Sequence, residues 1–207
     1  MTTNDARRST ELPTPPRWAV AMLRLLLRSD DAETVTGDLL EEYRDTVYPA
    51  SGQWQADMWF ARQTAGFAWR AAAPWGLLLA LFMSGRFVLD TFVPPESYSA
   101  RSFFTTWSAI LVYLLAASRA GWRTGRAGSG MLVALGAHTI GWTVNAAITA
   151  AIFIGVIRNQ PAMLSLFQQT GGWGEQWFLP LMLLPIVIVL GSVGGAVGRS
   201  IARRARA

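Results

Sequence analysis

The chain has 207 residues, of which 52% are hydrophobic and 15% are charged. A soluble domain has about 25% charged residues, so this composition favours a membrane protein. There is no cysteine and all 18 basic residues are arginine, which excludes disulfides, thiolate metal ligands, a cysteine nucleophile and the lysine of a Walker-type phosphate loop.

The formal net charge of +5 is distributed unevenly along the chain. Residues 1–50 hold six arginines and nine acids, whereas residues 71–207 hold ten arginines and three acids. The sequence therefore predicts an acidic, polar front part and an apolar remainder with positive edges.

The front part begins with polar residues 1–14, which we expect to be disordered. A helix should open at Pro15-Pro16, because proline is tolerated in the first helical turn. Its apolar residues recur at helical spacing and start at Trp18. Asp30 and Glu33 fit a capping box at the start of a second helix, so the two helices should form a hairpin.

The second helix contains the segment GDLLEEYRD, residues 37–45. Its apolar stripe includes Tyr43, and its carboxylates fall off that stripe. Three interpretations are open: a solvated face that pairs with Arg24, Arg28 or Arg44; a face that docks a protein partner, since acidic blocks often meet basic partners; or acid–base chemistry, which no second constellation supports. The docking interpretation involves Arg24, Arg28, Asp38, Glu41, Glu42 and Asp45.

A third helix is expected over residues 53–72, and it is rich in tryptophan and phenylalanine. Such aromatic enrichment is typical of a membrane interface. This helix should lie along the membrane surface or run directly into the first span.

The run PPRWAVAMLRLLLRSDDAETVTGDLLEEYRD, followed by WFARQTAGFAWR, resembles the N-terminal prefix domain of bacterial ABC permeases of the macrolide-exporter type. The resemblance covers about residues 15–70. It implies a cytoplasmic helical module, attached to a membrane protein, that acts in assembly or regulation. Those permeases carry a large domain after the first span, whereas the corresponding loop here is only about residues 94–102, and no ATPase motif is present.

Four stretches are apolar enough to cross a bilayer, which needs about 20 residues per helix. They are expected at about 71–93, 103–118, 130–157 and 177–197, within a membrane domain of residues 71–198 that ends in a basic tail, 199–207. Arginines cluster at 119, 123 and 126 and in the tail. The positive-inside rule then places both termini and the middle loop in the cytoplasm, and the resemblance to bacterial permeases implies the bacterial inner membrane.

The third stretch carries His138, Trp142, Asn145 and Thr149 on one helical face. Polar groups within a membrane are costly and tend to face the bundle interior. They indicate either a polar track for a small solute or hydrogen bonds between helices. In the first stretch, Arg86 and Asp90 are spaced to pair across one turn.

The fourth stretch carries four glycines at GxxxG spacing: Gly191, Gly194, Gly195 and Gly198. Small residues allow helices to approach closely, here either within the bundle or between subunits of a homo-oligomer.

These patterns predict an all-α integral membrane protein with four transmembrane helices, an N-terminal cytoplasmic hairpin and a juxtamembrane helix. We expect no enzymatic activity, no cofactor or metal, and no nucleic-acid partner. The favoured function is docking of a protein partner, as an accessory or regulatory subunit of a permease complex or as the target of a cytoplasmic regulator. The alternative is a small transporter or channel that uses the polar track.

Overall fold

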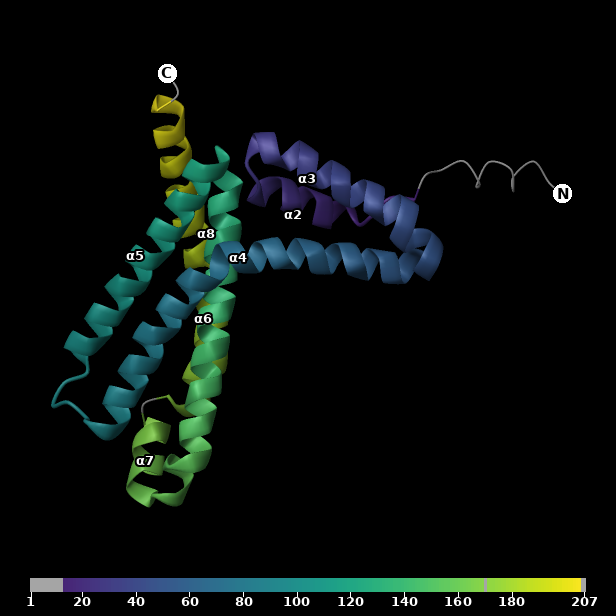
Figure 1. The fold of residues 1–207 in the computed structure, drawn as a ribbon. Helices are drawn as coiled ribbons and strands as arrows, with labels where there is room; N and C mark the ends of the chain where they lie inside the picture. Colours follow the sequence, from purple (N-terminus) through teal and green to yellow (C-terminus); the bar gives the residue numbers. More distant parts are fainter. Residues whose placement is uncertain (1–12, 170, 206–207) are drawn as a thin grey trace. The chain divides into compact units, whose positions relative to one another are not determined.

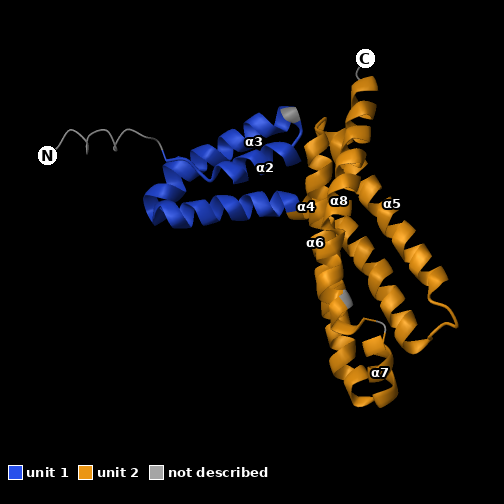
Figure 2. Cartoon of the chain, turned by 180° about the vertical axis from the view of Figure 1, so that it is seen from behind, with its two compact units in different colours: residues 1–68 blue, residues 69–207 orange. Residues whose placement is uncertain are grey.

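The computed structural model describes residues 13–169 and 171–205, and the described part is built of helices (Figure 1). Two compact units divide between Ala68 and Trp69, beside the module boundary expected at residue 70 (Figure 2). Helix α4, Tyr48–Phe92, contributes residues to both units. Most of the N-terminal segment expected to be disordered, residues 1–12, lies outside the described part of the chain.

Unit 1 contains α2, Arg17–Leu26, α3, Ser29–Glu42, and the first part of α4. The core of unit 1 is formed by Ala19, Leu23, Tyr43, Ala56 and Phe60, each with no exposed surface. The predicted hairpin therefore packs against the aromatic third helix. Apolar burial between three short helices stabilises the unit, at roughly 25 cal/mol per Å² of apolar surface.

The reversal between α3 and α4 depends on two local features. A π-helical turn, Tyr43–Val47, follows α3 directly. Gly52 then adopts φ 76° and ψ 172°, a region that is essentially restricted to glycine. The chain can therefore turn back so that Phe60 reaches Tyr43, with their rings 6.0 Å apart and nearly perpendicular.

Two details of unit 1 differ from the sequence prediction. The capping box is wrong: α3 begins at Ser29 after Arg28, without a side-chain cap, and Asp30 lies in the first turn. There its negative charge interacts favourably with the positive end of the helix dipole. Trp18 is 59% exposed, because α2 turns Ala19 and Leu23 toward the core instead.

Unit 2 contains the rest of α4 together with α5, Ser99–Thr124, α6, Ala127–Gly155, and α8, Gly172–Arg204. A 3₁₀ turn, Ile157–Asn159, and the short helix α7, Pro161–Gln169, connect α6 to α8. In the described part of the chain, four helices are long and apolar enough to cross a membrane, as predicted.

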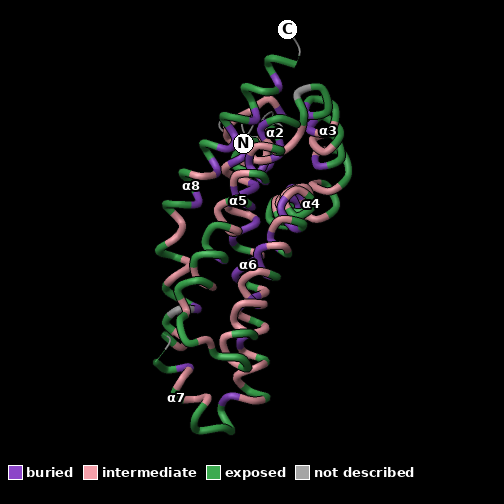
Figure 3. The backbone as a smooth tube through the Cα atoms, turned by 90° about the vertical axis from the view of Figure 1, so that its left-hand side faces the viewer, coloured by how far each residue is buried: buried purple, intermediate pink, exposed green. Residues whose placement is uncertain are grey.

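The apolar surface of these four helices is largely unburied. Only 22% to 33% of the most apolar window of each helix is buried inside the chain, and exposed positions recur along α5 and α8 (Figure 3). Large side chains such as Leu111, Phe178 and Met182 are more than half exposed. Contiguous apolar surface of this kind marks contact with a membrane or a partner.

The predicted glycine stripe packs inside the unit. A Cβ on Gly195 would collide with the backbone carbonyl of Ala127, and a Cβ on Gly198 with that of Ser118. Likewise, a Cβ on Gly194 would come within 2.8 Å of Ala117 Cβ, and one on Gly191 within 2.9 Å of Ala134 Cβ. The stripe therefore lies against α5 and α6 of the same chain, which is the intramolecular alternative.

The helices extend beyond the predicted spans at the arginine-rich ends. Arg119 and Arg123 lie on α5 and not in a loop, and only Gly125 and Arg126 separate α5 from α6. Gly125 adopts φ 70° as the left-handed cap of α5. The expected tail is also helical as far as Arg204, since α8 continues to that residue.

Candidate functional site

The polar face of α6 points into unit 2. His138, Asn145 and Thr149 are at most 3% exposed and Trp142 is 7% exposed. His138 bonds in two directions: its Nδ1 lies 2.8 Å from the hydroxyl of Tyr113 on α5, and its Nε2 lies 3.1 Å from the carbonyl of Pro180 on α8. One imidazole thus joins three helices.

Asn145 makes a second polar junction two turns further along α6. Its Oδ1 accepts a hydrogen bond from Ser84 of α4 at 3.1 Å, and its Nδ2 donates to Gln176 Oε1 of α8 at 2.9 Å. Buried amides need such partners, because an unpaired one costs about 1–3 kcal/mol. Spacing predicted the α6 residues, but not Tyr113, Ser84 or Gln176, which come from other helices.

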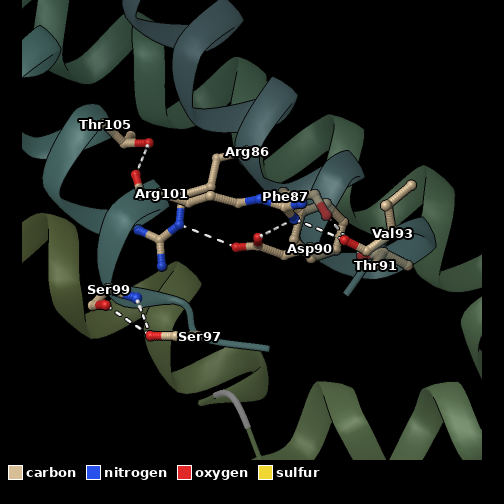
Figure 4. A network of polar contacts seen from close by, with 9 residues as sticks. All are labelled: Arg86, Phe87, Asp90, Thr91, Val93, Ser97, Ser99, Arg101 and Thr105. Atoms are coloured by element: carbon tan, nitrogen blue, oxygen red, sulfur yellow. Dashed lines mark hydrogen bonds and ion pairs between the residues drawn. The ribbon is translucent and has the colours of Figure 1, made fainter. Parts of the chain in front are cut away.

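A charged network closes the end of unit 2 at which α4 meets α5 (Figure 4). Arg86 Nε donates to Asp90 Oδ2 at 3.1 Å, so the predicted pair forms. Arg101, which the sequence did not single out, donates to Asp90 Oδ1 at 3.0 Å and to the carbonyl of Val93 at 2.9 Å. One carboxylate therefore holds two guanidinium groups.

A cavity of about 990 Å³ lies between these junctions. Its lining comes from α4, α5, α6, α7 and α8 and is mostly apolar. The polar groups in the lining include Arg86, Asp90, Tyr113, Asn145 and Gln176. A mostly apolar hollow with a few polar groups is the usual form of a ligand site, and its volume lies at the upper end of the range of roughly 300–1,000 Å³ for such sites.

The acidic segment lies on the surface of unit 1. Asp38, Glu41, Glu42 and Asp45 are all exposed, and within the described residues none of them forms an ion pair or a hydrogen bond. The arginines expected beside them are engaged differently: Arg28 lies 4.0 Å from Asp30, and Arg44 donates to the carbonyl of Pro13. Arg24 is exposed in the last turn of α2.

Behind this surface, Tyr43 anchors the π-helical turn. Its hydroxyl donates to Asp57 Oδ1 at 2.7 Å and accepts from Gln53 Nε2 at 2.9 Å. The carbonyl of Thr14, at the start of the described part of the chain, lies 3.4 Å from the same hydroxyl. Burial raises the pKa of Tyr43, and the hydrogen bond and charge of Asp57 raise it further.

No group of three or more histidine, cysteine or acidic side chains is placed to hold a metal ion within the described ranges. Comparison with known proteins gives no match: no family model, no curated protein and no solved structure is similar to this chain. The fold and the sites of these two units therefore carry the functional argument.

Proposed function

We propose that this chain is a non-enzymatic, multi-pass membrane protein whose unit 1 docks a protein partner on the cytoplasmic side. The resemblance to permease prefix modules makes a permease complex or a cytoplasmic regulator the expected kind of partner. The chain would then serve as an accessory or regulatory subunit in a bacterial inner membrane, with both termini in the cytoplasm.

The observation that carries this proposal is the acidic face of α3 and the π-helical turn, whose carboxylates have no partner among the residues that the structure describes. Asp38, Glu41 and Glu42 are exposed, and the chain's own arginines at positions 28 and 44 are bonded elsewhere. An uncompensated acidic surface attracts a basic partner and fixes its orientation. The core around Tyr43 holds this face on helices, and sites on helices are positioned more precisely than sites on loops.

The alternative function, a transporter or channel that uses the α6 polar face, has less support. His138 and Asn145 each bond to two neighbouring helices. Hydrogen bonds of this kind join helices within a membrane, and they occupy the groups that a passing solute would need.

Charge reversal of Glu42 tests the docking proposal. Glu33 is a matched control, because it is also exposed on α3 and lies nine residues away, which is two and a half turns at 3.6 residues per turn. Wild type, Glu42→Arg and Glu33→Arg would be purified in mild detergent, and their co-purifying proteins would be quantified by mass spectrometry.

We expect a partner that is recovered with wild type and Glu33→Arg but depleted at least about tenfold with Glu42→Arg, because a like-charge contact at an interface costs several kcal/mol. Circular dichroism would show that both variants keep their helix content. Equal recovery of every protein with Glu42→Arg and wild type would refute docking by this face.

A further inference from the structure

We propose that the cavity in unit 2 binds an amphiphile that has an acyl chain and an anionic headgroup, with the chain along α8 and the headgroup at Arg86. The site belongs to unit 2 alone, so it is independent of partner docking by unit 1. The proposal rests on the shape of the cavity, the character of its lining and the free donors at one end.

The shape of the cavity suits a chain more than a compact solute. Gln176 and Leu190 both line it, and they are fourteen residues apart on α8, or about 21 Å at a rise of 1.5 Å per residue. Between them the lining includes Met182, Leu183 and Ile186. Apolar side chains over this length can pack along an acyl chain.

The charge at the α4–α5 end suits an anion. Two guanidinium groups surround the single carboxylate of Asp90, which leaves one net positive charge. Glu96, in the connection between α4 and α5, is exposed and does not line the cavity. The low dielectric of a membrane domain strengthens attraction between this positive charge and an anionic group.

Arg86 also has donors to offer. A guanidinium carries five N–H donors, and in the described part of the chain Arg86 uses only Nε, toward Asp90. Its side chain is partly exposed and lines the cavity. Asp90 thus orients a guanidinium whose two terminal nitrogens face no described partner, and paired N–H donors of this kind bind carboxylate and phosphate oxygens in bidentate fashion.

The amides in the lining lie close to Arg86. Asn145 bonds to Gln176 and also to Ser84, which is two residues from Arg86. Farther along α8, the lining is formed mainly by aromatic and aliphatic side chains, including Val187 and Leu190. The ionic recognition is confined to the end at Arg86.

Native mass spectrometry of the delipidated, full-length chain in neutral detergent tests this inference. The probes are dioleoylphosphatidylglycerol, zwitterionic dioleoylphosphatidylcholine and oleate. We expect at least one of the two anionic probes to bind about tenfold more tightly than phosphatidylcholine. A hydrogen bond to a charged group contributes binding free energy equivalent to about this ratio of dissociation constants. Whether phosphatidylglycerol or oleate binds more tightly distinguishes a phosphodiester headgroup from a carboxylate. If neither anionic probe binds more tightly than phosphatidylcholine, the proposal is wrong.

Two pairs of variants separate the site from general lipid contact. Arg86→Gln should abolish the preference for the anion, whereas Arg158→Gln, which removes an exposed positive charge outside the cavity lining, should keep it. Thr106 and Leu111 are both exposed on α5, but only Thr106 lines the cavity. Thr106→Trp should therefore narrow the cavity and weaken all binding, whereas Leu111→Trp should not.

An equal loss in Arg86→Gln and Arg158→Gln would assign the preference to overall charge and overturn the proposal. If Arg86→Gln does not fold, the second pair decides alone: unchanged binding in Thr106→Trp would exclude the cavity as the site.

Discussion

At the scale of single residues, a few buried polar side chains determine how the helices within each unit are joined. Tyr43 links the π-helical turn to α4 through Asp57 in unit 1, and His138 and Asn145 link helices in unit 2. Each of these residues is buried and each reaches an element distant in sequence. A buried polar group with all of its partners specifies one arrangement of the helices, because any other arrangement would leave it unpaired.

Substitution of Tyr43 by phenylalanine tests its role in unit 1. The ring and its packing remain, but the hydrogen bonds to Asp57 and Gln53 are lost. We expect unit 1 to lose about 1 kcal/mol of stability. Hydrogen exchange of peptides from residues 15–68 in the full-length chain measures this, with peptides from α8 as an internal control. Unchanged protection in unit 1 would show that the hydroxyl does not contribute.

The pH dependence of Tyr43 follows from its raised pKa. Burial favours the neutral phenol. The contribution of Tyr43 to the stability of unit 1 is therefore complete below the ordinary tyrosine pKa of about 10 and declines as the pH rises above that value. The tyrosinate absorbance of wild type minus that of Tyr43→Phe should therefore rise at higher pH than that of an ordinary tyrosine. A difference signal that rises at the pH where an ordinary tyrosine ionises would contradict the buried hydrogen bond.

At the scale of helices, the sequence pattern predicted which helices exist better than it predicted where each helix ends and which helices it contacts. The length of the apolar stretches predicted the four long helices, because spanning a bilayer requires a run of consecutive apolar residues, which can be read directly from the sequence. The helices continue past the predicted spans at Arg119 and Arg199, since a charged residue can continue a helix beyond its apolar stretch. Hydropathy does not register this continuation.

The candidate site shows the same division between local and long-range information. The α6 polar face and the Arg86–Asp90 pair follow from spacing within one helix, so they were predictable. Arg101 was not, because it comes from the next helix and reaches Asp90 from eleven residues away. The π-helical turn at Tyr43 depends on Asp57 and Gln53 across the core, and no short-range pattern encodes it.

The glycine stripe of α8 gives the sharpest prediction at this scale. In Gly195→Ala the new Cβ would meet the backbone of Ala127 and Gly130, so α8 must move away, at a cost of about 1–3 kcal/mol. Gly85→Ala is the control, because no atom lies within 4 Å of its added Cβ. Unfolding by sodium dodecyl sulfate in mixed micelles, followed by circular dichroism, measures both.

We expect Gly195→Ala to unfold at lower detergent fraction than wild type, and Gly85→Ala to unfold at the same fraction or a higher one, since alanine favours helix over glycine. If Gly195→Ala instead alters only the oligomeric state in analytical ultracentrifugation, the stripe serves contacts between subunits.

At the scale of the whole molecule, the account combines a small helical unit that has its own core with four helices that expose most of their apolar surface. Unit 1, which has its own core, can face water and a protein partner. The four long helices, which expose apolar surface, can face lipid. Both proposals, partner docking by unit 1 and amphiphile binding by unit 2, depend on the four helices crossing a membrane. Crossing by an even number of helices is therefore the central claim.

Cysteine labelling tests that claim directly, because the chain has no native cysteine. Single cysteines would replace Thr46, Ser97, Gln160 and Ser200, which are all exposed, and sealed right-side-out membrane vesicles would be treated with a membrane-impermeant maleimide. We predict labelling of positions 97 and 160 in intact vesicles, and labelling of positions 46 and 200 only after the vesicles are permeabilised. Labelling of positions 97 and 200 from the same side would contradict the four-span arrangement on which both proposals rest.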